Sequence, residues 1–112
     1  MKIMIVGSRS IKDYDLSELV PPEAELIISG GALGVDALAE GYADKHKISK
    51  LILRPRYEKY GRVAPLKRNE LMVDLADEVI VLWDGESKGT KHTIEYAKKN
   101  GKPVKLILIE GK

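Results

Sequence analysis

The sequence predicts a single α/β domain over residues 1–112, with a Rossmann-like, doubly wound sheet of five parallel strands in the order 3-2-1-4-5. Two observations predict it. Five short apolar runs recur along the chain, and segments with helix signals separate them. Such alternation favours a parallel sheet with helices on both faces. The runs are apolar nearly throughout, which is typical of strands covered on both faces.

The predicted strands are rich in leucine and β-branched residues. They cover residues 2–6, 25–29, 50–54, 78–83 and 104–109. We expect the ligand of such a sheet to lie beyond the carboxyl ends of strands 1 and 4, where the strand order reverses.

Helix signals lie between the strands. Residues 34–47 carry apolar side chains at helical spacing, and His46 completes that stripe as a structural residue. Residues 64–76 have a proline near their start, where a helix tolerates one. Residues 90–100 are followed by a glycine and then a proline, which end a helix. Residues 13–20 could form one short helix.

Composition excludes several classes of protein. The chain has no cysteine, so disulfides, thiolate metal sites and cysteine nucleophiles are excluded. No apolar run approaches the roughly 20 residues of a membrane span, and the first residues resemble a strand rather than a signal peptide. We therefore expect a cytoplasmic protein without a membrane partner. The apolar edges of a thin sheet make a homo-oligomer plausible.

The arginines are concentrated in one part of the predicted fold. Four of the five lie within residues 54–68, and the fifth, Arg9, follows the first strand. Right-handed crossovers bring every strand-to-helix loop to the same edge of the sheet. Four of the arginines belong to these loops. The remaining arginine, Arg68, lies in the first turns of a helix, where its side chain leans back towards the same edge. This placement predicts an anion-binding edge.

The stretch SGGALGVDALAE, residues 29–40, supports a phosphate-type ligand. Glycines let the backbone approach an anion, helix N-termini offer free N–H groups, and arginine adds bidentate hydrogen bonds. The loop departs from a dinucleotide fingerprint because it follows the second strand and because the next strand ends in Arg54 rather than an acid. Gly30 and Gly31 could instead be turn residues, and Gly34 could serve close packing. Asp36 could cap its helix, contact a ribose or organise the loop.

Four motifs in order resemble the SLOG superfamily: GSR, SGGALGVDALAE, PLKRNELM and VLWDGESKGTKHTIEYAKKNGKPV. That group contains the Smf/DprA DNA-processing proteins, the LOG phosphoribohydrolases that release cytokinin bases, and many small Rossmann-like proteins. The resemblance covers nearly the whole chain and is closer to the DprA motifs. It implies a nucleotide, a nucleotide-sugar derivative or single-stranded nucleic acid as ligand. The residues that it marks as facing the ligand are Gly7, Ser8, Arg9, Ser29, Gly30, Gly31, Gly34, Asp36, Arg68, Asn69, Ser87, Gly89, Thr90 and Thr93. Asp84, at the end of the fourth strand, joins this predicted set.

One departure from the LOG pattern concerns catalysis. LOG hydrolases carry a glutamate three residues after the threonine of P-G-G-x-G-T-x-x-E. Here Arg68 and Met72 match the second LOG motif, but Thr93 stands three residues after Thr90. Glu95 lies two positions further on, about 140° round the helix from Thr90. Arg68 and Glu95 are therefore the candidate catalytic residues, and whether the protein is an enzyme stays open.

The favoured function is binding of a nucleotide or nucleotide-derived phosphate ligand, as a sensor or binding module without turnover. The alternatives are a phosphoribohydrolase, that is an N-glycosidase acting on a nucleoside monophosphate, and single-stranded DNA binding of the DprA type. Trp83 could belong to the core or stack on a base. No dedicated metal site is predicted, since His92 has no partner ligands. Mg²⁺ could accompany the nucleotide at Asp84 and Glu86.

Overall fold

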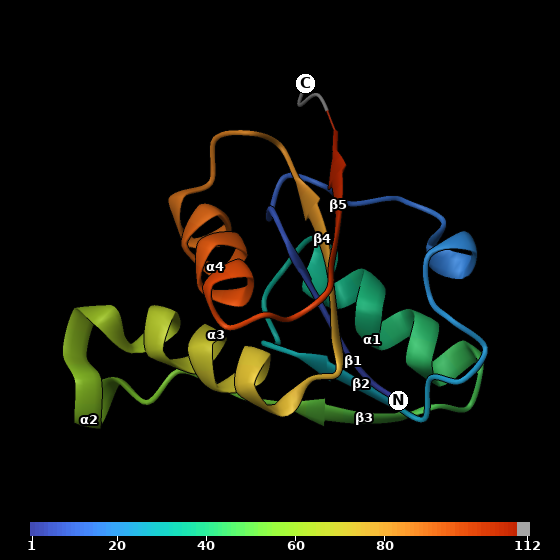
Figure 1. Ribbon diagram of the computed structural model, residues 1–112, viewed down its shortest axis with the longest axis horizontal. Coiled ribbons are helices and arrows are strands. Elements are labelled where there is room, and N and C mark those ends of the chain that lie inside the picture. The colour runs from blue at the N-terminus through green and yellow to red at the C-terminus, as the bar shows by residue number, and fades with distance from the viewer. Residues whose placement is uncertain (110–112) are drawn as a thin grey trace.

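The computed structural model describes residues 1–109 and contains one five-stranded, all-parallel sheet with the order β3-β2-β1-β4-β5 (Figure 1). The strands are β1 (Lys2–Gly7), β2 (Leu26–Ser29), β3 (Ser49–Ile52), β4 (Glu78–Trp83) and β5 (Val104–Leu108). Every neighbouring pair is parallel. The predicted fold class and strand order are therefore confirmed.

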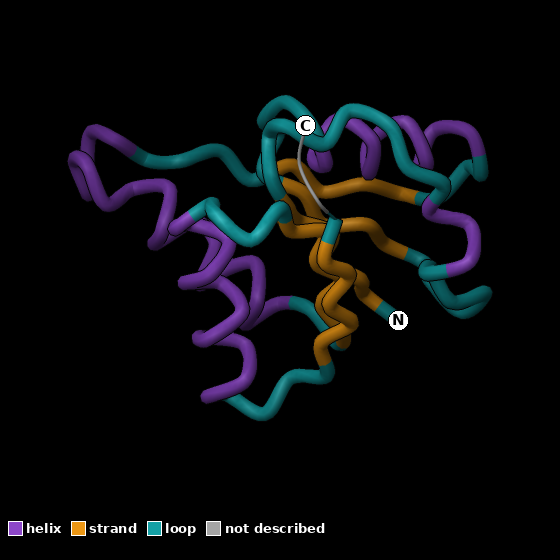
Figure 2. The backbone as a smooth tube through the Cα atoms, turned by 90° about the horizontal axis from the view of Figure 1, so that it is seen from above, coloured by secondary structure: helices purple, strands orange, loops and turns teal. Residues whose placement is uncertain are grey.

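Helices cover both faces of the sheet. The three longer ones are α1 (Val35–Lys45), α3 (Ala64–Leu75) and α4 (Lys88–Lys99), and the short ones are η1 (Leu16–Glu18), α2 (Tyr57–Tyr60) and η2 (Gly61–Val63). Figures 1 and 2 show α1 on one side of the sheet and α3 and α4 on the other. None of the helices within residues 1–109 has both the length and the apolar character needed to cross a membrane.

Alternate residues of the central strands supply two separate cores. Ile3 and Ile5 of β1 are fully buried in the cluster that includes α1, whereas Met4 and Val6 belong to the cluster that includes α3 and α4. This is the two-residue period of a strand whose faces are both covered. The central strands are thus fixed from both sides, which holds the loops at their carboxyl ends in place.

The prediction that all five strands are covered on both faces is wrong for the two edge strands. Ser49 and Lys50 at the start of β3 are exposed, and Leu106 and Leu108 of β5 are 40% and 65% exposed. The helices pack mainly over the three central strands, so the apolar character of β5 exceeds what its burial requires. The predicted homo-oligomer stays a prediction.

Two boundaries also differ from the prediction. The expected helix in residues 13–20 is only the 3₁₀ turn η1, which begins where Asp15 Oδ1 accepts a hydrogen bond from the Ser17 amide at 3.0 Å. Strand β3 ends at Ile52, so Arg54 belongs to the following loop. Arg54 can therefore turn towards the loop after β2.

Candidate anion-binding site

A cavity of about 370 Å³ lies at the carboxyl edge of the sheet, between the ends of β1 and β4. These adjacent strands are the point at which the strand order reverses, so the cavity is where open α/β sheets bind their ligands. Its lining contains the predicted residues Gly7, Ser8, Arg9, Asp36, Arg68, Asn69, Asp84, Ser87, Gly89 and Thr90. It also contains Val6, Ser10, Ala32 and Pro65, which were not predicted.

The loop after β1 forms one wall of the cavity. The Ser8 amide donates to the carbonyl oxygen of Leu82 at 3.0 Å, and Ser8 Oγ accepts from the Asp84 amide at 3.0 Å. A Cβ atom on Gly7 would collide with the same Leu82 carbonyl oxygen, which explains the glycine. Arg9 is exposed and lines the cavity. The wall is therefore rigid, and its charged side chain is available to a ligand.

The loop after β2 contacts two guanidinium groups. Arg68 Nη1 donates to the carbonyl oxygens of Gly30 at 2.8 Å and Leu53 at 3.0 Å, and Arg54 Nη1 donates to that of Gly31 at 3.3 Å. A Cβ atom on Gly30 would lie 2.6 Å from Arg68 Nη1, and one on Gly31 would lie 2.6 Å from Arg54 Nη1. The two glycines make room for these arginines. Neither glycine lines the cavity, and their expected contact with an anion stays a prediction.

Asp36, in the first turn of α1, lines the cavity and has one carboxylate oxygen without a hydrogen-bond partner. The residue is 5% exposed, and its Oδ2 accepts a hydrogen bond from the Ala32 amide at 3.1 Å. Its Oδ1 is buried without a hydrogen-bond partner. Burial raises the pKa of this carboxyl, against the opposing effects of the Ala32 amide and the Arg68 guanidinium. Asp36 thus organises the glycine loop with one oxygen, while the other is buried and unpaired.

The N-terminus of α4 forms the opposite wall. Ser87 is its N-cap, and Ser87 Oγ accepts from the Thr90 amide at 3.3 Å and from Thr90 Oγ1 at 3.0 Å. The first-turn amides of a helix carry partial positive charge and favour anions. Thr93 lies deeper, where its Oγ1 donates to the Gly89 carbonyl oxygen and accepts from Asn69 Nδ2, both at 3.0 Å. Thr93 therefore joins α3 to α4 and does not line the cavity.

Asp84 is occupied in building the loop between β4 and α4. Its Oδ1 accepts from the amides of Glu86 at 2.9 Å and Ser87 at 3.0 Å, and its Oδ2 accepts from Ser10 Oγ at 3.0 Å. These bonds, led by the two amides, lower the pKa of Asp84 to about 2. Over residues 1–109, no three histidine, aspartate or glutamate side chains converge as ligands of a metal ion. Mg²⁺ at Asp84 and Glu86 would therefore draw its remaining ligands from the nucleotide and water.

Three other predicted residues lie outside the cavity. Ser29 is fully buried, and its Oγ donates to the Asp36 carbonyl oxygen at 3.4 Å. Gly34 adopts φ 74° at the N-cap of α1, where a Cβ atom would lie 2.6 Å from backbone atoms of Ser8 and Arg9. Glu95 is exposed and lines no part of the cavity. Since a helical residue five positions after Thr90 faces another direction, Glu95 is not brought together with Arg68.

Three further side chains that could serve either the fold or a ligand, His46, His92 and Trp83, make contacts within the protein. His46 packs its ring against Tyr42, with ring centroids 4.2 Å apart. His92 Nε2 lies 2.8 Å from Glu70 Oε2. Trp83 is half-buried, packs against the core next to α3 and α4, and donates from Nε1 to the Ser87 carbonyl oxygen at 3.1 Å. The indole therefore supports the loop that carries the α4 N-terminus.

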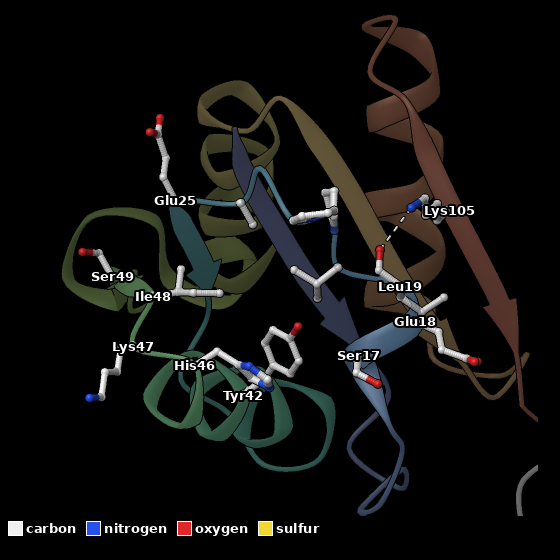
Figure 3. Close-up of a pocket in the computed structure, with 14 residues that line it drawn as sticks. Ser17, Glu18, Leu19, Glu25, Tyr42, His46, Lys47, Ile48, Ser49 and Lys105 are labelled. Carbon is white, nitrogen blue, oxygen red and sulfur yellow. Dashed lines mark hydrogen bonds between the residues drawn. The ribbon is translucent and has the colours of Figure 1, made fainter.

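A larger cavity, about 1010 Å³, lies at the other end of the sheet (Figure 3). It is lined by residues before β2, by the start of β3 and by the end of α1, including Glu25, Ser49 and His46. Lys105 Nζ closes one side of it by donating to the Leu19 carbonyl oxygen at 3.0 Å. This cavity contains none of the predicted site residues. Because parallel sheets bind ligands at their carboxyl edge, we assign the site to the smaller cavity.

The fold and the cavity define a parallel α/β protein with a polar cavity at the carboxyl edge of its sheet. The chain is 31% identical to the gene 61 protein of Mycobacterium phage D29 over 116 aligned positions, which cover 92% of this chain and 93% of that protein. The chain belongs to the same family as this phage protein.

A second relative matches the chain over a shorter stretch. The chain is 37% identical over 59 residues to the uncharacterized SPbeta prophage-derived protein YoqJ of Bacillus subtilis (strain 168). That match covers 50% of this chain and 30% of the Bacillus protein, so the matched region is a minor part of the longer protein. No family model and no solved structure matches the chain.

Proposed function

We propose that the protein binds a nucleotide or nucleotide-derived phosphate ligand at the carboxyl edge of its sheet, as a sensor or binding module without turnover. One observation carries the proposal: the same cavity combines an anion-attracting wall with a buried, unpaired carboxylate oxygen. The exposed Arg9 and the N-terminus of α4 favour a phosphate. Asp36 Oδ1 would repel a phosphate but accept a hydrogen bond from a hydroxyl group.

A phosphorylated sugar satisfies both requirements at once. Its phosphate would lie at Ser87 and Thr90, and a hydroxyl would donate to Asp36 Oδ1, which otherwise carries the cost of an unmade hydrogen bond. Inorganic phosphate would leave that oxygen unpaired. The motif resemblance to the SLOG superfamily, in a chain without cysteine, supports a nucleotide ligand in the cytoplasm.

The test is isothermal titration calorimetry with AMP, adenosine, inorganic phosphate, ADP-ribose, NAD and a short oligo-dT. We expect at least one nucleotide to bind. Adenosine or inorganic phosphate alone should bind at least about tenfold more weakly, because each lacks at least one charge-assisted contact of the nucleotide. The variant Arg9→Gln should weaken nucleotide binding. Its control is Lys12→Gln, an exposed residue near the same loop that lies outside the cavity.

Two results would overturn the proposal. If no nucleotide of the panel binds, the cavity is not a nucleotide site. If only oligo-dT binds, with an affinity that falls steeply as salt increases, single-stranded DNA binding replaces the proposal, because neutralised phosphates release counterions. Equal losses in Arg9→Gln and Lys12→Gln would show that only the overall charge matters.

A second candidate, the nucleoside-monophosphate N-glycosidase, is favoured by Asp36. Of the acids near the site, Asp84 is engaged in its loop and Glu95 is remote, whereas Asp36 has a free oxygen and a raised pKa beside Arg68. Asp36 could take a proton from water as the oxygen attacks the sugar C1′ and the bond to the base breaks, and that proton would then pass through solvent to the departing base. Free base released by the wild type and not by Asp36→Asn would establish this activity. Its absence with bound nucleotide would establish binding without turnover.

A further inference from the structure

A second cavity, of about 320 Å³, lies on the other side of Arg68 from the proposed nucleotide site. It is formed by the loop after β3, by α2 and by the first turns of α3. Its lining is Leu53, Arg54, Arg56, Lys59, Tyr60, Ala64, Lys67, Arg68 and Leu71. Five of these nine residues are cations, and none is an acid. We call this the basic cavity.

Two of these five cations, Arg56 and Lys67, form ion pairs with neighbouring acids. Arg56 Nε lies 3.3 Å from Glu58 Oε2 in an exposed pair, and Lys67 Nζ lies 3.9 Å from Glu70 Oε1. Such exposed pairs contribute little to stability and are easily exchanged for another anion. Lys59 Nζ instead lies 5.2 Å from the centroid of the Tyr60 ring. The basic cavity therefore carries more positive charge than its neighbouring acids neutralise.

Arg68 connects the basic cavity to the nucleotide site, since it lines both. Its Nε donates to Asn69 Oδ1 at 2.7 Å, and its Nη1 donates to the carbonyl oxygens of Gly30 and Leu53. These bonds fix the guanidinium at the boundary between the two cavities. Burial lowers the pKa of Arg68, and the carboxylate of Asp36, which lines the nucleotide site, opposes this effect.

We infer that the basic cavity binds a second phosphate, so that the ligand is a nucleoside with phosphates on both sides of its sugar, as in a nucleoside 3′,5′-bisphosphate or a dinucleotide. The inference rests on the proposed function and extends it. The two cavities share only Arg68 in their linings, so a phosphate at the N-terminus of α4 and a second one in the basic cavity would lie on either side of a sugar at Asp36. A mononucleotide would fill only the first.

The experiment compares isomers that differ in where the second phosphate lies. For each of the four bases, calorimetry is performed with the nucleoside 5′-monophosphate, the 5′-diphosphate and the 3′,5′-bisphosphate. The protein is used as wild type, as Arg56→Gln/Lys59→Gln, and as Lys98→Gln/Lys99→Gln. The first double variant removes two exposed cations of the basic cavity. The second removes two exposed cations from the far end of α4, so that the net charge changes equally.

We expect the bisphosphate of one base to bind wild type at least about tenfold more tightly than its monophosphate and its 5′-diphosphate, the contribution of one charge-assisted contact. That advantage should disappear in Arg56→Gln/Lys59→Gln and persist in Lys98→Gln/Lys99→Gln. Binding of the monophosphate should be similar in all three proteins.

Each of the other outcomes overturns the inference. If monophosphates bind and bisphosphates bind no more tightly, the basic cavity holds no phosphate, and the proposed function stands. If the 5′-diphosphate gains as much as the bisphosphate, net charge explains the gain. If no nucleotide binds, the proposed function fails as well. If an eight-residue oligo-dT binds more tightly than every bisphosphate, the basic cavity follows a nucleic-acid backbone and the ligand is not a small molecule.

Discussion

Arg68 Nη1 donates a hydrogen bond to the carbonyl oxygen of Gly30 at 2.8 Å, across 38 residues of sequence. A Cβ atom at position 30 would lie 2.6 Å from the same nitrogen and 2.9 Å from Asp36 Oδ2. The absence of a side chain at this position therefore allows the guanidinium and the carboxylate to lie side by side. This contact links the glycine-rich loop of the sequence to its arginine cluster.

Gly30→Ala should displace Arg68 while leaving the fold intact. The added methyl group would meet the far end of a long side chain, so we expect a loss of about 1–3 kcal/mol in the free energy of unfolding, typical of overpacking. Nucleotide affinity should fall by at least about tenfold, since Arg68 loses its position. Urea denaturation and calorimetry measure the two effects.

The control for Gly30→Ala is Gly41→Ala in α1, where an added Cβ atom meets nothing within 4 Å. Replacing an exposed helical glycine with alanine should stabilise the protein by about 0.5–1 kcal/mol without changing affinity. Wild-type nucleotide affinity in Gly30→Ala would contradict the role given to the Arg68 position.

Asp36→Asn should stabilise the protein at pH 7 and weaken nucleotide binding. The buried carboxylate with one unpaired oxygen costs more than a neutral amide, so we expect a gain on the order of 1 kcal/mol. Asparagine retains one acceptor oxygen for the Ala32 amide and loses the free one. Calorimetry should therefore show weaker binding despite the higher stability.

The gain in Asp36→Asn should depend on pH in a defined direction. Burial raises the pKa of Asp36 in the folded protein above its ordinary value of 3.8, so the folded state binds more protons than the unfolded state between the two values. Wild-type stability therefore falls as pH rises through that range, and the variant lacks this fall. Denaturation curves of the two proteins should converge below about pH 3.8. A difference that is constant with pH would show that ionisation of Asp36 is not its cause.

The sequence predicts most of this fold because the central strands are buried on both faces and are therefore apolar over most of their length. The same pattern misjudges β5, whose Leu106 and Leu108 are apolar although exposed. An apolar run reports only the composition of a segment. An edge strand with an apolar composition therefore cannot be distinguished from a central strand by sequence. The pattern also does not predict that η1 is a single 3₁₀ turn, since Asp15 indicates a helix cap but not the number of turns that follow.

For the site, the sequence predicts the edge and most of the residues that line the cavity. It does not predict how Gly30 acts, because glycine makes room equally for an anion or for a guanidinium, and only the packing of Arg68 distinguishes the two. It also misses the Leu53 carbonyl oxygen, since backbone acceptors carry no residue signature. Ser10 could have been found, because it follows Ser8 and Arg9 in the loop after β1.

Asp84→Asn should lower stability at neutral pH, by about 1 kcal/mol or less because the group is partly exposed to solvent. Hydrogen bonds from the Glu86 and Ser87 amides hold the pKa of Asp84 at about 2, below the ordinary value of 3.8. The folded protein thus gains stability from the carboxylate above pH 3.8, and loses it as pH falls towards 2. Acid titration followed by circular dichroism should show the two proteins converging over this range, opposite in sign to Asp36→Asn. Equal stability at pH 7 would contradict this role.

We expect Gly34→Ala to destabilise the protein more than Gly30→Ala or Gly41→Ala. The variant Gly61→Ala separates the two causes of this loss, which are backbone strain and steric overlap. Gly34 has φ 74° and ψ −127°, and Gly61 has φ 57° and ψ −133°, so both positions have nearly the same backbone conformation, which residues with a Cβ atom rarely adopt. Each alanine therefore incurs a conformational cost of about 1–3 kcal/mol. A Cβ atom at Gly61 meets nothing within 4 Å, whereas one at Gly34 lies 2.6 Å from backbone atoms of Ser8 and Arg9, which cannot rotate away.

We therefore expect Gly34→Ala to lose about 1–3 kcal/mol beyond the loss in Gly61→Ala, the cost of overpacking against fixed atoms. Urea denaturation of both variants measures the difference. Nucleotide binding should fall only in Gly34→Ala, since the α1 N-terminus and the loop after β1 would separate there. Equal losses of stability in the two variants would mean that the contact with Ser8 and Arg9 relaxes without cost, and the rigid wall assigned to that loop would be wrong.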